Sequence, residues 1–303
     1  MKFSVWPNMS RPWSEVHAFA RHIEDLGWHG LWYADHYMPN SDSEKTLPGP
    51  VHECFAMLSA LAATTSRLRL GSLVTPTTVN HPALIANRAA TIDNISNGRF
   101  VLGMGAGWQI NEHEGFGIEL FDPKARVDRF EEAIRIVSMM LTQERTDFAG
   151  THFTLRDVPC EPAPVQDPLP ILVGTGGPRM LRIVARHAHE WNTWGPPAGT
   201  AAVVANLNAA CEKEGRDPST VHRSVQGLWF MVPDDATAEK VRAVAPAERA
   251  IIGTTSQLVD VVGAYREQGF DEIIVPDFTM GASESERFDN YSRFDAEVVA
   301  HFR

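Results

Sequence analysis

The chain has 303 residues, of which 44% are hydrophobic and 21% are charged, and this balance excludes a disordered or fibrous protein. Lys and Arg total 27 against 38 Asp and Glu, so the net charge is -11, and general nucleic-acid binding is excluded because it requires a basic surplus. The sequence has no apolar run of membrane-spanning or signal-peptide length, and its three cysteines form no C-x-x-C pair. We therefore expect a cytoplasmic protein with no membrane contact and no metal site.

Eight short apolar or β-branched runs predict buried parallel strands. They cover residues 3–6, 30–34, 68–75, 99–104, 170–173, 190–194, 224–232 and 272–275. Eight amphipathic stretches with helical spacing alternate with these runs, at residues 13–26, 53–65, 82–95, 125–141, 178–189, 200–214, 256–268 and 285–302. Eight βα units favour a single α/β domain over residues 1–303, folded as a closed (β/α)8 TIM barrel.

Two stretches interrupt this alternation. Residues 142–168 carry four prolines and a hairpin-like segment, FAGTHFTL, which predicts an insertion between strand four and strand five. Residues 233–249 predict a smaller insertion after strand seven. The helix ends are also marked, because Gly27 and Gly269 are suited to C-caps and Pro82 and Pro178 to first helical turns.

One pair of residues at a strand end has evident proton chemistry. In TIM barrels the functional side chains lie on the loops that leave the C-terminal ends of the strands. Asp35 and His36 follow strand two, and histidine changes its charge near neutral pH while a neighbouring carboxylate can orient it. We predict His36 as the catalytic residue. The alternative for such a pair is a structural hydrogen bond.

A glycine-rich turn follows strand five. Gly174, Thr175, Gly176 and Gly177 open a helix, so free backbone N–H groups and the positive end of the helix dipole are available to hold a phosphate, with Arg179 close by. The alternative is a tight turn between strand and helix. No nucleoside-triphosphate motif is present in the sequence.

Tryptophans gather at the predicted strands and their ends. This group comprises Trp6, Trp32, Trp108, Trp191, Trp194 and Trp229. Some of them are expected in the core, and those at the barrel mouth are suited to wall a pocket for a flat, conjugated ligand.

These motifs together resemble the luciferase-like monooxygenase superfamily, and within it the branch that depends on the deazaflavin coenzyme F420. The resemblance rests on GLWYADHY from Gly30, on the long segment from Leu68 to Trp108 and the NEHEGFG that follows it, on PILVGTGG from Pro170, and on EWNTWG from Glu190. It implies a (β/α)8 barrel with an insertion between strands four and five, and a homodimer.

The resemblance also implies a cofactor site. Asp35 would contact the deazaflavin, and His36 would transfer a proton or stabilise charge. A non-prolyl cis peptide bond is expected in this region at Ser72–Leu73, with Leu73–Val74 as the second choice. The remaining predicted cofactor contacts are Ser72, Leu73, Val74, Thr75, Gly105, Gly107, Trp108, Asn111, Gly174, Thr175, Gly176, Gly177, Arg179 and Trp194.

The predicted function is an F420-dependent oxidoreductase that transfers a hydride between the deazaflavin ring and a small organic substrate. One alternative is a monooxygenase that uses reduced FMN and oxygen, and another is a non-catalytic barrel that serves as a subunit or cofactor carrier. The sugar-phosphate dehydrogenase branch has an acidic residue where this chain has Trp108, and a tryptophan where it has Met38-Pro39-Asn40, so a sugar phosphate is not expected. A carbonyl, imine, enoate or alcohol is compatible.

The acidic net charge raises a question about the cofactor. F420 carries a polyglutamate tail, which an anionic protein repels unless a local patch of positive charge offsets the repulsion. Arg179, Arg182 and Arg186 are the candidates for such a patch.

Overall fold

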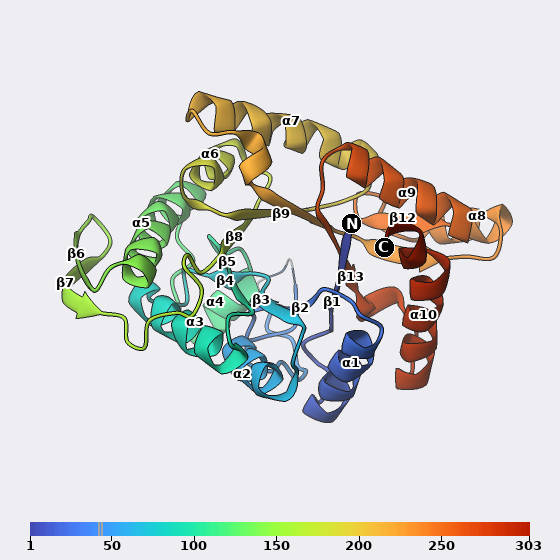
Figure 1. The fold of residues 1–303 in the computed structure, drawn as a ribbon, viewed down its shortest axis with the longest axis horizontal. Coiled ribbons are helices and arrows are strands. Elements are labelled where there is room, and N and C mark those ends of the chain that lie inside the picture. Colours follow the sequence, from blue (N-terminus) through green and yellow to red (C-terminus); the bar gives the residue numbers. More distant parts are fainter. Residues whose placement is uncertain (42, 44) are drawn as a thin grey trace.

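A computed structural model describes residues 1–41, 43 and 45–303. Eight parallel strands form its centre (Figure 1), and they are β1 (Lys2–Trp6), β2 (Gly30–Tyr33), β3 (Arg69–Ser72), β5 (Phe100–Gly105), β8 (Ile171–Gly174), β9 (Glu190–Trp194), β10 (His222–Gln226) and β13 (Glu272–Pro276). Each strand pairs with the next. The ring is closed because β1 pairs with β13, with Lys2 opposite Glu272, and β3 pairs with β5, with Leu70 opposite Phe100. The predicted (β/α)8 barrel is confirmed.

Helices surround the strands on the outside of the barrel (Figure 1), and they are α1 (Trp13–Asp25), α2 (Cys54–Thr64), α3 (Pro82–Ser96), α5 (Pro123–Thr142), α6 (Pro178–His187), α7 (Pro197–Lys213), α9 (Thr255–Glu267) and α10 (Glu284–Glu297). Their ends follow the predicted signals. Pro82 and Pro178 open α3 and α6. Gly27 and Gly269 follow α1 and α9 with φ angles of 77° and 83°, which glycine adopts without a steric penalty. Among the described residues, no helix combines the length and apolar character that a membrane crossing requires.

Two of the predicted strands are interrupted. The run at 68–75 is divided into β3 and the two-residue strand β4 (Thr75–Pro76). The run at 224–232 is divided at Gly227, where β11 (Leu228–Met231) leaves the barrel and pairs with β12 (Ala250–Gly253), a strand that the sequence did not predict. A side chain at Gly227 would overlap Ile251 of β12, so this close approach requires glycine.

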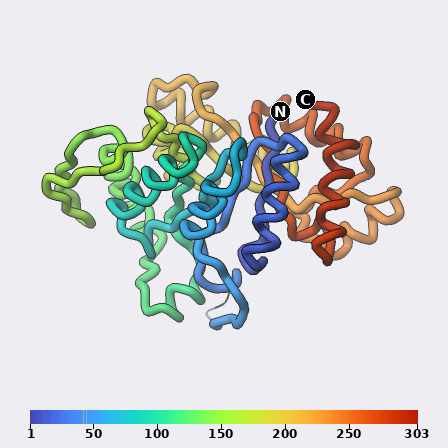
Figure 2. Tube along the Cα trace, turned by 60° about the horizontal axis from the view of Figure 1, so that its bottom comes forward, coloured from blue at the N-terminus to red at the C-terminus, as the bar shows by residue number. Residues whose placement is uncertain are grey.

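The predicted hairpin between strands four and five is confirmed. Its strands β6 (Arg145–Ala149) and β7 (Thr154–Pro159) pair antiparallel and project from the left edge of Figure 1. Two helices were not predicted, α4 (Ile110–Phe116) after β5 and α8 (Asp235–Arg242) in the insertion after β11. Figure 2 shows the two chain termini next to each other, and the rings of Phe3 and Phe302 are 6.5 Å apart.

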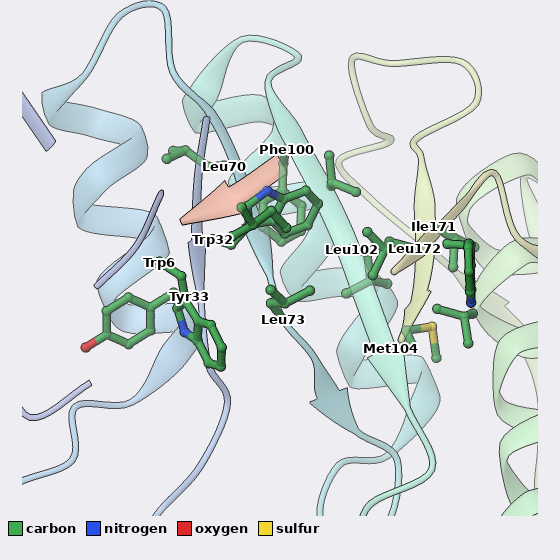
Figure 3. Packing of buried hydrophobic residues seen from close by; sticks show 14 of the residues in the cluster. Trp6, Trp32, Tyr33, Leu70, Leu73, Phe100, Leu102, Met104, Ile171 and Leu172 are labelled. Atoms are coloured by element: carbon green, nitrogen blue, oxygen red, sulfur yellow. The ribbon is translucent and has the colours of Figure 1, made fainter. Parts of the chain in front are cut away.

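The barrel interior is packed with large side chains, several of which Figure 3 shows around Trp32. Trp32 is buried over Gly71, where any side chain would overlap the indole ring. The three cysteines, Cys54, Cys160 and Cys211, are buried and free.

Paired charges fill the end of the barrel at which the strands begin. Arg69 of β3 forms an ion pair with Glu190 of β9 across the interior. Glu272 of β13 accepts hydrogen bonds from Trp32 Nε1 at 2.8 Å and from His222 Nε2 at 3.1 Å. Burial alone would raise the pKa of Glu272, but the hydrogen bond and positive charge of His222 lower it to about 2. These groups close the N-terminal end of the barrel, where side chains contribute to stability.

Candidate functional site

His36 lies at the C-terminal end of β2, and its side chain is held by Glu112 of α4. His36 Nδ1 is 3.1 Å from Glu112 Oε1, and the backbone N–H of Tyr37 donates to Glu112 Oε2 at 3.0 Å. The Glu112 side chain is only 2% exposed, whereas that of His36 is 13% exposed. The edge of the Trp108 ring contacts His36, with ring centroids 5.6 Å apart. Nδ1 is therefore engaged, and Nε2 is the nitrogen available to a ligand.

Asp35 precedes His36 and is fully buried. Neither of its carboxylate oxygens has a hydrogen bond of good geometry among the described residues. Burial raises the pKa of Asp35 to about 7, the nearby Glu53 carboxylate adds to the rise, and His36 opposes it. Burying a polar group without a partner costs free energy, so the environment of Asp35 is suited to a ligand that supplies the missing hydrogen bonds.

More buried polar atoms without a hydrogen-bond partner among the described residues lie in β4 and directly after it, and at the start of α4. They are the hydroxyls of Thr75 and Thr77 and the side-chain oxygens of Gln109 and Asn111. The amide nitrogens of Gln109 and Asn111 donate to the carbonyl of Pro39, at 3.2 and 3.3 Å, which fixes both side chains. This arrangement fits the polar edge of a flat heterocycle, which carries both hydrogen-bond donors and acceptors.

The non-prolyl cis peptide bond lies at Leu73–Val74, between β3 and β4. Our first choice, Ser72–Leu73, is wrong by one residue, and the second choice is confirmed. Ser72 is instead tied to the next strand, since its hydroxyl donates to the Gly103 carbonyl at 2.9 Å and accepts from the Gly103 N–H at 3.1 Å. A side chain at Gly103 would overlap the Ser72 carbonyl oxygen. Val74 follows the cis peptide bond and lies beyond the end of β3.

Two glycines that we predicted as cofactor contacts surround the Val74 side chain. A Cβ atom at Gly105 would lie 2.7 Å from one methyl group of Val74, and a Cβ atom at Gly174 would lie 3.3 Å from the other. Both glycines thus leave room for Val74. Gly107, in the loop after β5, likewise leaves room for Thr78. Its φ angle is 86°, and a side chain at this position would overlap the Thr78 hydroxyl.

The predicted phosphate-binding turn lies at the start of α6. Gly177 is the N-cap residue of this helix and provides no side-chain cap, and Gly176 and Gly177 are exposed. A Cβ atom at Gly177 would meet nothing within 4 Å. Thr175 is held from behind, because its N–H donates to the Asn192 carbonyl at 3.1 Å and its own carbonyl accepts from Trp191 Nε1 at 2.8 Å. The turn therefore has space for an anion in front of it.

Arg179, in the first turn of α6, and Arg186, in its last turn, are paired with acidic residues. Arg179 lies 2.5 Å from Asp128 and 3.2 Å from Glu131. Arg186 lies 3.4 Å from Glu131 and 2.8 Å from Glu214. Two of the three arginines of the expected positive patch are therefore paired with carboxylates, whereas the exposed Arg182 forms no ion pair with any of the described residues.

An aromatic cluster lines another region of the barrel mouth. The ring centroid of Trp6 is 5.5 Å from that of Trp194 and 5.1 Å from that of Phe278. The guanidinium carbon of Arg249 lies 5.3 Å from the centroid of the Trp194 ring. Trp6 is buried, as are the tryptophans at positions 32, 191 and 229, and these four belong to the core. The partly exposed Trp194 and the exposed Trp108 are thus the tryptophans placed to contact a flat ligand.

Sequence reasoning missed Glu112, Gln109 and Thr77. The signal for Glu112 was the polar segment Asn111–Glu112–His113 directly after a glycine-rich strand end, and all three of these residues are buried. In the portion of the chain that the structure describes, no group of three or more His, Cys, Asp or Glu side chains is arranged to hold a metal ion.

Comparisons with known proteins identify the family of this chain. A family described as luciferase-like monooxygenase matches residues 1–276. The F420-dependent glucose-6-phosphate dehydrogenase of Kineococcus radiotolerans is 30% identical over 233 residues, which are 75% of this chain and 67% of that protein. Pyrimidine monooxygenase RutA of Cronobacter sakazakii is 33% identical over 197 residues, which are 63% of this chain and 56% of that protein.

The fold is also found in solved structures. An F420-dependent secondary alcohol dehydrogenase, in complex with an F420–acetone adduct, superposes with a TM-score of 0.83 at 17% identity, covering 99% of this chain and 98% of that one. The similar proteins are named dehydrogenases and monooxygenases, so this chain is an oxidoreductase. The match over residues 1–276 shows that the chain belongs to the luciferase-like monooxygenase family.

Proposed function

We propose that this protein is an F420-dependent oxidoreductase in which a hydride passes between the deazaflavin ring and a carbon atom of a small organic substrate, while His36 moves the accompanying proton. The observation that carries the proposal is the Asp35–His36 pair at the end of β2. The buried carboxylate of Asp35 has no hydrogen bond of good geometry among the described residues, although the Thr75 hydroxyl lies near it, and His36 has one nitrogen engaged and the other available. The similarity to an F420-dependent dehydrogenase supports the choice of cofactor.

The residues around Asp35 fit the deazaflavin ring. Asp35 would bind a ring N–H or hydroxyl, and the side-chain oxygens of Gln109 and Asn111 would accept further hydrogen bonds from the polar edge. Val74 would support one face of the ring, and Gly176 and Gly177 would hold the phosphate at the start of α6. The bound cofactor supplies a ring carbon that accepts or donates a hydride.

The family resemblance and the named dehydrogenase favour an alcohol–carbonyl couple as the substrate. In the oxidative direction Nε2 of His36 would take the hydroxyl proton of the alcohol, and the bound cofactor would take up the hydride from the same carbon, which leaves a carbonyl. In the reductive direction the protonated Nε2 returns the proton to the carbonyl oxygen. The buried Glu112 carboxylate stabilises the positive charge that His36 acquires.

A specific observation favours FMN as a second candidate cofactor. Arg179 in the first turn of α6 and Arg186 in its last turn are both paired with carboxylates, so these two side chains add little net positive charge for an acidic cofactor tail. FMN has a phosphate but no such tail. The similarity to pyrimidine monooxygenase RutA agrees with this alternative.

The two candidates are separated by titrating the purified protein with F420 and with FMN while tryptophan fluorescence is recorded. We expect saturable quenching by F420, because Trp108 contacts His36 directly. Asp35→Asn should weaken F420 binding at least tenfold, whereas Asp289→Asn, a matched change on the exposed side of α10, should leave it unchanged. Tight binding of FMN with no binding of F420 would refute the proposal.

A further inference from the structure

The contacts of the Glu112 carboxylate determine which ring nitrogen of His36 carries a proton. We propose that Glu112 is a positioning residue that holds neutral His36 with its proton on Nδ1, so that Nε2 presents a lone pair to the substrate. The inference builds on the proposed role of His36 in proton transfer. The tautomer itself is measured without cofactor or substrate, so the two proposals fail independently.

The two oxygens of Glu112 face two donors. His36 Nδ1 lies 3.1 Å from Oε1 and 3.3 Å from Oε2, and Oε2 also accepts the backbone N–H of Tyr37 at 3.0 Å. A backbone N–H can only donate, which fixes the orientation of the carboxylate. An ionised carboxylate can only accept, so the hydrogen bond to His36 requires a proton on Nδ1.

Two further features restrict the His36 ring. The Trp108 ring stands nearly perpendicular to it, with an interplanar angle of 80°. Glu112 is 2% exposed and belongs to α4, so water has little access to compete for Nδ1. None of the described residues forms a hydrogen bond with Nε2, which leaves this nitrogen for the proton of a substrate. A negative charge behind Nδ1 also stabilises the imidazolium form during the transfer.

Glu112→Gln tests the assignment because an amide has one acceptor and one donor group. The contact with the Tyr37 N–H keeps its acceptor, whereas the contact with His36 Nδ1 gains a donor in place of an acceptor. The glutamine oxygen must face Tyr37, since the backbone N–H still needs an acceptor. Its NH2 group then faces His36 and donates to Nδ1, so the proton of the neutral ring moves to Nε2. Glu114→Gln is the matched control, because Glu114 lies on the same helix and is exposed.

The tautomer is measured on the whole protein labelled with ¹⁵N in its 12 histidines, by long-range ¹H–¹⁵N correlation at a pH at which His36 is neutral. His36→Gln identifies the signals of His36 by their loss. We expect Nδ1–H in the parent protein and in Glu114→Gln, and Nε2–H in Glu112→Gln. A parent protein with Nε2–H, or with an even mixture of tautomers, overturns the proposal even if the Glu112 variant does not fold.

A kinetic measurement distinguishes positioning from simple support of the fold. If F420 turnover is established, Glu112→Gln should lower kcat about 100-fold, in the range of acid–base catalysis, while the Kd for F420 changes less than about threefold. A loss of activity without a change of tautomer would overturn the positioning role. If F420 does not bind at all, the proposed function fails, and the tautomer assignment is judged by the spectra alone.

Discussion

Replacing Asp35 with asparagine should stabilise the protein without its cofactor at neutral and alkaline pH. Burial raises the pKa of this carboxyl group from an ordinary value of 3.8 to about 7. At 1.36 kcal/mol per pKa unit, this difference corresponds to about 4 kcal/mol. The folded protein binds the proton more tightly than the unfolded chain does. The stability that Asp35 contributes is therefore fully present below about pH 3.8 and is lost as the pH rises to about 7.

The asparagine variant has no such titration, because its amide is uncharged throughout this range. The difference in free energy of unfolding between Asp35→Asn and the parent protein should thus grow by about 2 kcal/mol from pH 5 to pH 7, in favour of the variant. Urea denaturation of both proteins at pH 5, 6, 7 and 8 gives this difference directly. Taking the difference removes the contributions of all other titrating groups that the two proteins share.

Asp289→Asn is the control, because Asp289 is exposed on α10, and it should show a difference that does not vary with pH. If the difference for Asp35→Asn is equally flat between pH 5 and pH 8, then Asp35 is not held in an unfavourable site. If the variant becomes less stable than the parent as the pH rises, the carboxylate has a partner that stabilises its charge. Either result would remove the main structural support for a ligand at Asp35.

Two further predictions concern the packing and the charges of the barrel. Gly103→Ala should lower the free energy of unfolding by about 3 kcal/mol in urea denaturation, because its Cβ would overlap the Ser72 carbonyl, whereas Gly176→Ala should have little effect, since the nearest atom would be 3.8 Å away. If Gly103→Ala has the same free energy of unfolding as the parent protein, the backbone around Gly103 can move to accept a side chain. Glu272→Gln should lose about 3 kcal/mol at pH 6, because the pKa of Glu272 falls from 4.5 to about 2 on folding. This contribution is present above about pH 4.5 and disappears toward pH 2, so the free energies of unfolding of the two proteins should converge in acid. If their difference stays constant with pH, the pKa of Glu272 is not lowered by His222 and its neighbours.

The eight barrel strands could be predicted because each is a short apolar run that is buried on both faces. The same feature explains why the division of one run and the strand β12 were not predicted. The run at 224–232 is buried throughout most of its length, so the only mark of the point where the chain leaves the barrel for β11 is the single glycine Gly227. The partner strand β12 has only four residues and follows an insertion, and its short apolar run has no periodicity of its own.

The candidate site was predicted as far as local sequence determines it. Asp35, His36 and the glycine turn before α6 each follow a strand end, which a single sequence reveals. The contacts between distant segments were not accessible in this way. Glu112 meets His36 across 76 positions of the chain, and its helix α4 is too short to show an amphipathic pattern. The acidic residues that neutralise Arg179 lie on another helix, α5, and the sequence does not show that the two helices meet.

Buried carboxylates are paired at the N-terminal end of the barrel and lack such pairing at the C-terminal end, and this contrast bears on how the protein can evolve. Glu190 and Glu272 at the N-terminal end have partners in the interior, so substitutions there remove contacts that hold the strands together. Asp35 at the C-terminal end contributes nothing comparable to the fold. Mutations around it can therefore accumulate with little loss of stability, which leaves this scaffold free to acquire new substrates by changing only the loops that follow its strands.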